Sequence, residues 1–172
     1  VKFTRWHTLG RDLGRLLADA LRQPLAAAGS PPVVLIPAPT TLRRRFSRGI
    51  DHSRCLAIGA SKALGVPCIP ALAREHRPSQ LSVPPSQRVS NVANAFSPRR
   101  RACRAFSGKG VIVIDDVMTT GATMRGLCRA VREGGRNLEK SGQGSRPVFV
   151  WAAVLARTEE GHHLVPDTVN TW

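Results

Sequence analysis

The sequence predicts an α/β fold: a doubly wound, mainly parallel sheet of Rossmann-like type. Residues 111–114 are four consecutive β-branched apolar side chains without polar alternation, as expected of a parallel strand that is covered on both faces. Residues 9–28 instead repeat apolar side chains at helical spacing. The length of 172 residues suits one domain of ordinary size with a proper core.

The first half of the chain alternates helix and strand. An amphipathic helix over residues 9–28 is predicted to end at Gly29. A short buried strand follows at residues 33–36, and its carboxyl end leads into a proline-rich turn. We expect a second helix over residues 50–64 and then a short strand at residues 66–70.

The second half begins with an irregular stretch. Residues 73–110 lack steady periodicity and contain several prolines, which indicates a long functional loop or hood. After the strand at 111–114 we expect a helix over residues 123–133 that stops at the Gly134-Gly135 pair. Residues 137–146 then resemble a flexible insertion, and residues 148–155 form the last strand.

Two carboxylates and a loop of small residues follow the central strand. Asp115 and Asp116 lie at the carboxyl end of the strand, where ligands bind in open α/β sheets. The loop combines hydroxyls, small side chains and a glycine, so that backbone N–H groups can surround an anion at the start of a helix. A ribose 5-phosphate fits both parts. The loop residues are Thr119, Thr120, Gly121, Ala122 and Thr123.

The run VIVIDDVMTTGATM at residues 111–124 resembles the signature with which type I phosphoribosyltransferases bind 5-phosphoribosyl 1-pyrophosphate (PRPP). The alternative is the βα turn of another doubly wound protein with a chance Asp-Asp pair. Residues 33–56 and 77–96 resemble segments of the ComF family of competence-associated phosphoribosyltransferase-like proteins. This likeness spans most of residues 5–157 and implies a type I phosphoribosyltransferase-like fold with a hood, or flexible loop.

The resemblance also implies roles for individual residues. Asp115 and Asp116 would be catalytic, holding the ribose hydroxyls and stabilising positive charge on the ring, while residues 119–123 fix the 5-phosphate. Mg²⁺ would accompany PRPP, and the protein would reach it only through Asp115 and Asp116, by way of water. The pyrophosphate loop would be Pro37, Ala38, Pro39 and Thr40, unless these residues form an ordinary strand-ending turn. The hood would contribute Arg74, Arg77, Gln80, Arg88 and Asn91, although Arg74 and Arg77 also suit a solvated helical face.

The chain departs from the ComF pattern in two respects. Where the family has an aromatic residue, Asn and Gln, this chain has Ile50, Asp51 and His52. The four-cysteine zinc module that family members commonly carry at the N-terminus is not found in this sequence. The four cysteines are dispersed without a CxxC motif, so we expect reduced, buried thiols rather than a metal cluster or disulfides: Cys55, Cys68, Cys103 and Cys128.

The formal net charge of +15, from 26 Lys and Arg against 11 Asp and Glu, is extreme for a small-molecule enzyme. Pyrophosphate needs only a few cations, so the surplus indicates an anionic partner such as single-stranded DNA. A GC-rich genome is the alternative explanation, and the chain has no tyrosine to stack on bases. Two clusters are the nucleic-acid candidates: Arg43, Arg44, Arg45 and Arg48, and Arg99, Arg100, Arg101 and Arg104.

The leading hypothesis is therefore a ComF-type phosphoribosyltransferase that uses PRPP and releases pyrophosphate, with an unidentified acceptor. The second is a DNA-binding accessory of competence or recombination that keeps a PRPP pocket and contacts proteins of those processes. A PRPP-sensing transcription regulator is disfavoured, because no helix-turn-helix pattern precedes the domain. No signal peptide or membrane-spanning run is visible, so we expect a cytoplasmic protein without membrane insertion. The expected domain plan is a helical segment (1–30), a phosphoribosyltransferase-like domain (31–160) and a tail (161–172).

Overall fold

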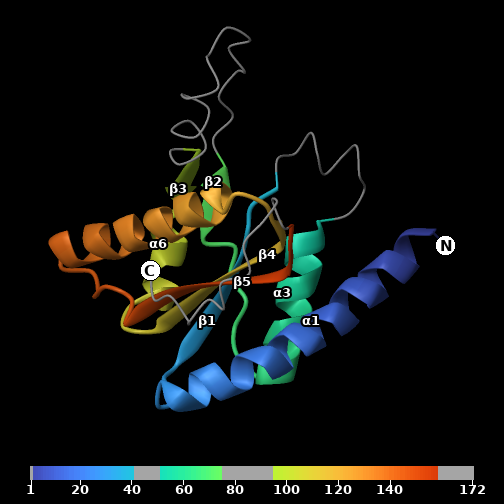
Figure 1. The fold of residues 1–172 in the computed structure, drawn as a ribbon. Helices are drawn as coiled ribbons and strands as arrows, with labels where there is room; N and C mark the ends of the chain where they lie inside the picture. The colour runs from blue at the N-terminus through green and yellow to red at the C-terminus, as the bar shows by residue number, and fades with distance from the viewer. Residues whose placement is uncertain (1, 41–50, 75–94, 159–172) are drawn as a thin grey trace, which may run out of the picture.

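The computed structural model describes residues 2–40, 51–74 and 95–158 (Figure 1). Within these ranges the longer elements alternate between helix and strand. In chain order the elements are α1 (Lys2–Ala27), β1 (Val33–Pro37), α3 (His52–Leu64), β2 (Leu72–Arg74), β3 (Phe96–Pro98), α5 (Arg100–Cys103), the 3₁₀ helix η1 (Arg104–Phe106), β4 (Gly110–Met118), α6 (Ala122–Lys140) and β5 (Phe149–Arg157).

The central sheet has the strand order β1-β4-β5, and both pairings are parallel. Helices α1 and α3 cover one face of this sheet and α6 covers the other (Figure 1). A separate antiparallel pair joins β2 to β3 near one end of α6. The predicted doubly wound, mainly parallel α/β fold is therefore confirmed.

The two faces of the sheet bury alternate residues of the same strands. Val34 and Val113 pack into the core beneath α6, whereas Leu35 and Ile112 pack into the core beneath α1 and α3. All four side chains are fully buried. Successive side chains of a strand point to opposite faces, so a strand covered on both sides needs an apolar residue at every position. This explains the uninterrupted apolar runs in the sequence.

Helices α1 and α3 cross closely at two glycines. A Cβ atom on Gly14 would overlap the carbonyl oxygen of Leu56, and one on Gly59 would overlap that of Arg11. The backbones of the two helices therefore approach closely at this crossing. Helix α1 runs from Lys2, which is seven residues earlier than the apolar spacing predicts.

The predicted strand at residues 66–70 is wrong. Only an isolated bridge forms there, between Leu35 and Cys68. The Leu35 N–H donates to the Pro67 carbonyl, and the Ile69 N–H donates to the Leu35 carbonyl, both at 2.9 Å. Pro67 and Pro70 have no N–H group, so the ladder of hydrogen bonds cannot extend in either direction.

The interpretation of residues 73–110 as a stretch without elements is also wrong at both ends. It misses β2 and β3, and it misses the short α5 and η1 that precede β4. Arg100 and Arg101 consequently lie within a helix rather than in a loop. Three-residue strands are too short to show a hydrophobic period, which explains the miss. Residues 75–94 lie outside the described residues.

Helix α6 does not stop at Gly134 and Gly135, as the sequence suggested, but continues to Lys140. Both glycines are buried and permit close packing: a Cβ on Gly134 would lie 2.9 Å from Cys103 Sγ, and one on Gly135 would lie 2.5 Å from Pro147 Cδ. The predicted flexible insertion at 137–146 is therefore wrong for its first four residues, which are helical. The last strand is confirmed as β5.

The four cysteines are free, as predicted. Three are buried and Cys68 is half-buried, and burial raises the pKa of every one of these thiols. The raised pKa favours the protonated thiol over the reactive thiolate. Across the described residues, no helix has both the length and the apolar character that a membrane span requires.

Candidate functional site

A cleft opens where β1 ends beside β4. The pairing of these strands ends at Pro37 and Ile114, while β4 continues to Met118. Asp115 therefore lies immediately beyond the end of β1. The sequence had suggested a position after the central strand, but Asp115 lies inside β4. The cleft has a volume of about 190 Å³, and its lining comes from the turn after β1, the start of α3, β2, β3, the end of β4 and the first turn of α6.

Asp115 is held from the opposite wall of this cleft. Its Oδ1 accepts a hydrogen bond of 2.7 Å from the Ser53 hydroxyl and one of 3.0 Å from the Asp116 N–H. Burial raises the pKa of the Asp115 carboxyl, whereas the bond from Ser53 acts in the opposite direction because it favours the ionised form. Ser53 is the one buried polar side chain among the described residues. It anchors Asp115 in a fixed orientation.

Asp116 is more open to solvent. Its Oδ2 lies 3.4 Å from His52 Nδ1, and its Oδ1 accepts a hydrogen bond of 2.9 Å from the Val117 N–H. The His52 and Asp116 side chains are 44% and 35% exposed, so both can be reached by a ligand. The two neighbouring aspartates thus have different environments, one anchored and one accessible.

The N-terminus of α3 forms the wall opposite β4. Asp51 caps this helix by accepting from the Arg54 N–H at 3.1 Å, and the Thr40 hydroxyl donates to the same oxygen at 3.2 Å. Cap and hydroxyl tie the turn after β1 to the start of α3. His52 and Ser53 therefore lie in the first helical turn, where the helix dipole is positive and favours anions.

The predicted phosphate loop is a tight turn at the start of α6. Gly121 has a φ of +71°, a left-handed conformation that favours glycine. The Thr120 hydroxyl accepts from the Ala122 N–H at 3.4 Å. Of residues 119–123, only Thr123 lines the cleft, while Thr119 and Thr120 are exposed beside it.

The predicted pyrophosphate loop offers fewer donors than its position suggests. Pro37 belongs to β1, and the Ala38 N–H is already bonded to the Ile114 carbonyl at 2.8 Å. Pro39 has no N–H, and the hydroxyl of Thr40 is directed to Asp51. Ala38, Pro39 and Thr40 nevertheless line the cleft. A pyrophosphate in this cleft would need donors from the start of α3 or from Arg74 as well.

Arg74 is the hood residue that the structure describes. It lies at the end of β2, lines the cleft, and its Cζ is 5.5 Å from the centroid of the Phe96 ring. A cation at this edge suits an anionic ligand. The remaining hood candidates lie outside the described residues, as does the first arginine cluster: Arg77, Gln80, Arg88 and Asn91, and Arg43, Arg44, Arg45 and Arg48.

Sequence reasoning missed Ser53, Phe96 and Val117, all of which line the cleft. It identified Asp51 and His52 only as departures from a family pattern, and the structure places both at the site. The N-cap role of Asp51 carries a sequence signal, because Asp directly before an apolar helical run is a typical helix start. Ser53 carries no comparable signal, since its partner is 62 residues away.

The cleft fits a magnesium ion that arrives with its ligand. Among the described residues there is no group of three or more His, Cys, Asp or Glu side chains that could hold a metal alone. Mg²⁺ usually keeps several waters and binds through one or two carboxylates together with phosphate oxygens of the substrate. Asp115 and Asp116 supply that number of carboxylates.

Two proteins are among the solved structures whose fold is similar to that of this chain. One is an allosteric regulatory enzyme of purine biosynthesis, with a TM-score of 0.51 and 20% identity over 87% of this chain. The other is the glutamine PRPP amidotransferase of B. subtilis in complex with ADP and GMP, with a TM-score of 0.51 and 22% identity over 87% of this chain.

The chain spans 26% of the length of each of these two proteins. No family model matches the sequence, and no curated protein matches it either. The chain thus has an α/β fold that is similar to part of each of these two proteins.

Proposed function

We propose that the cleft binds PRPP and that the protein transfers the phosphoribosyl group to a nitrogen nucleophile, with release of pyrophosphate. One observation carries this proposal. Two adjacent carboxylates, Asp115 and Asp116, share a cleft with Thr123 in the first turn of α6. A ribose 5-phosphate needs carboxylates for its hydroxyls and a helix N-terminus for its phosphate. The fold similarity supports the same substrate class.

The reaction would depend on charge and position rather than on covalent catalysis. As the bond from C1 to the pyrophosphate oxygen breaks, positive charge develops on the ribose ring, next to Asp115 and Asp116. The nitrogen then bonds to C1 and loses its proton to the departing pyrophosphate, which carries away the electron pair of the broken bond. Ser53 keeps Asp115 aligned, and the loop at 119–123 fixes the 5-phosphate, so that C1 stays in place. Mg²⁺ bound with PRPP would neutralise the leaving pyrophosphate, within reach of the two aspartates.

The experiment is a calorimetric titration with Mg-PRPP, followed by a pyrophosphate-release assay over a panel of bases and amines. We expect saturable binding and release that depends on one class of acceptor. Absence of PRPP binding would refute the proposal. Binding without release would favour the alternative function, a DNA-binding accessory of competence or recombination that keeps the pocket as a sensor.

The ComF assignment rests on the sequence pattern of residues 33–56 and 77–96 together with the loop. Its competence-related partners stay predictions. Repeating the PRPP titration with single-stranded DNA present tests them directly, because a DNA-linked sensor would show a different PRPP affinity when DNA is bound.

A further inference from the structure

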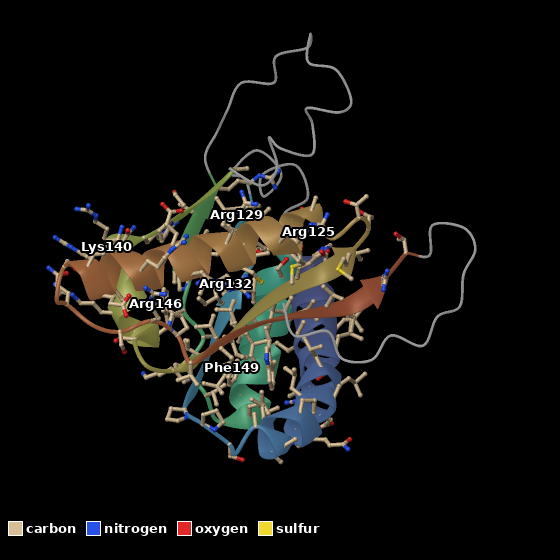
Figure 2. All side chains as sticks on the ribbon, turned by 60° about the vertical axis from the view of Figure 1, so that its left-hand side comes forward. Arg125, Arg129, Arg132, Lys140, Arg146 and Phe149 are labelled. Carbon is tan, nitrogen blue, oxygen red and sulfur yellow. The ribbon has the colours of Figure 1, made fainter. Side chains whose placement is uncertain are left out.

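Helix α6 presents a straight row of cations to solvent. Four of its five cationic side chains are exposed and Arg132 is half-buried. At about 100° per residue all five fall within one face of the helix. From the first to the last, the row is about 22 Å long, at a rise of about 1.5 Å per residue. The row, here called the α6 cationic face, consists of Arg125, Arg129, Arg132, Arg136 and Lys140, four of which Figure 2 labels along the helix.

Only two carboxylates belong to this helix, Glu133 and Glu139. Glu139 forms an ion pair with Arg146, which lies beyond the helix end (Figure 2). The charge of Glu139 is therefore balanced by Arg146, which is not part of the row. Glu133 lies four residues after Arg129 and three before Arg136, so it can offset part of their charge. Five cations against this one carboxylate still leave the α6 cationic face with a positive excess, in a protein whose formal net charge is +15.

Helix stability does not explain this arrangement. Like charges three or four residues apart destabilise a helix, and the row contains four such neighbouring pairs. The three opposite-charge pairs at these spacings, which Glu133 and Glu139 form with Arg129 and Arg136, do not outnumber them.

The helix dipole favours cations in the last turn, which suits Lys140, but it disfavours Arg125 in the first turn. The other three cations lie too far from either end for the dipole to account for them. The opposite face of α6 is buried against the sheet, so packing does not require the row either.

We propose that the α6 cationic face binds the sugar–phosphate backbone of single-stranded DNA. Four of the five cations are arginines, whose planar guanidinium groups bind phosphates with paired hydrogen bonds. A flexible single strand can follow a straight row of this length, whereas the backbone of a duplex winds away from it. No aromatic side chain occurs in α6, so the contact is to phosphates and independent of base sequence.

This surface differs from the clusters that the sequence suggested. Gly134 lies on the side of α6 opposite the row, and it packs against Cys103 of α5. Because Arg100 and Arg101 belong to α5, they lie on that opposite side of α6. An anionic membrane is a poorer match, because the apolar face of α6 is buried in the core and cannot insert into lipid.

The test is the triple variant Arg129→Gln/Arg136→Gln/Lys140→Gln, which leaves the phosphate loop and the half-buried Arg132 intact. Fluorescence anisotropy with a labelled single-stranded oligonucleotide should show about tenfold to hundredfold weaker binding at low salt. The slope of log K against log salt should become shallower by about 2, because each lost phosphate contact changes it by about 0.7. Mg-PRPP affinity and circular dichroism should be unchanged.

The matched control is Arg11→Gln/Arg15→Gln/Lys62→Gln, which removes the same charge from exposed positions on α1 and α3, on the other side of the sheet. We expect less than a threefold change in DNA affinity. An equal loss in control and test variants, or no loss in the test variant, would overturn the proposal. So would α6-dependent binding that is as tight for duplex DNA or phosphatidylserine vesicles as for the single strand.

Discussion

The two walls of the cleft are built in different ways. The β4 wall is one continuous stretch from Asp115 to the first turn of α6, and it carries the carboxylates and the proposed phosphate loop. The α3 wall combines Thr40 with His52 and Ser53, which belong to a different part of the chain, and Asp51 holds Thr40 from behind. Its side chains mainly hold other side chains: Thr40 bonds to Asp51, and Ser53 bonds to Asp115.

This difference separates binding groups from positioning groups. Changes on the β4 wall should remove ligand binding or turnover outright, because the groups there would touch the substrate. Changes on the α3 wall should have smaller effects, since they act through the orientation and ionisation of Asp115. The predictions below follow that order, from the largest effect to the smallest.

The largest effect is expected from Gly121→Glu. The new carboxylate would occupy the proposed phosphate site, and a Cβ at this position would already lie 3.1 Å from Arg125 Nη1. We expect PRPP affinity to fall at least about a hundredfold, or about 2.7 kcal/mol. Gly121→Ala introduces the same left-handed strain without the charge and should lose much less. Undiminished PRPP affinity in a folded Gly121→Glu protein would remove the loop from the site.

The double variant Asp115→Asn/Asp116→Asn should separate binding from chemistry. If the carboxylates act on the charge of the transition state, PRPP affinity stays within about tenfold while turnover falls by about a hundredfold or more. The control is Asp51→Asn, which removes a nearby carboxylate but keeps a good helix cap. Its turnover should stay within about threefold. Equal losses in affinity and turnover for the double variant would show that the aspartates bind the ground state.

On the α3 wall, Ser53→Ala should act through the ionisation of Asp115. In the native protein the hydrogen bond from Ser53 favours the ionised carboxylate. Without that bond, the pKa of Asp115 should rise further above its ordinary value. We expect the free energy of unfolding at pH 7 to fall by about 1.5 kcal/mol. This cost is present in full above the raised pKa and disappears as the pH falls through it, because protonated Asp115 no longer needs the bond.

Thermal melts of Ser53→Ala and the native protein between pH 4 and pH 8 measure this difference. Cys55→Ser, which alters a buried side chain two residues further along the same helix, is the comparison variant. Its stability cost should not follow the titration of Asp115. A Ser53→Ala cost that is constant across the range would mean that the hydroxyl acts by packing alone.

The sequence predicts the β4 wall because its parts are contiguous. The site follows from a buried strand, two aspartates and a small-residue loop that come one after another. Together they place the site at the carboxyl end of that strand. The α3 wall depends instead on which residues the fold brings together, and Ser53 and Asp115 meet only because α3 packs beneath β1 and β4. The sequence around either residue does not indicate that contact.

The glycines also show that local sequence alone does not determine a residue's structural role. Gly65 ends α3 in the left-handed conformation, which is typical of a glycine directly after an apolar helix. Gly134 and Gly135 have the same sequence character, yet they lie inside α6 because Cys103 and Pro147 pack against them. Whether a glycine ends a helix or accommodates a neighbour depends on tertiary contacts.

The smallest effect on the cleft is expected from Arg99→Gln/Arg100→Gln/Arg101→Gln. These side chains are exposed, and none lines either wall. Mg-PRPP affinity should therefore stay within about twofold, equivalent to about 0.4 kcal/mol. DNA affinity should fall less than in the α6 triple variant, with a shallower salt slope if the cluster adds phosphate contacts. Loss of PRPP binding with DNA binding intact would instead show that this cluster belongs to the cleft, as a third wall beside those of β4 and α3.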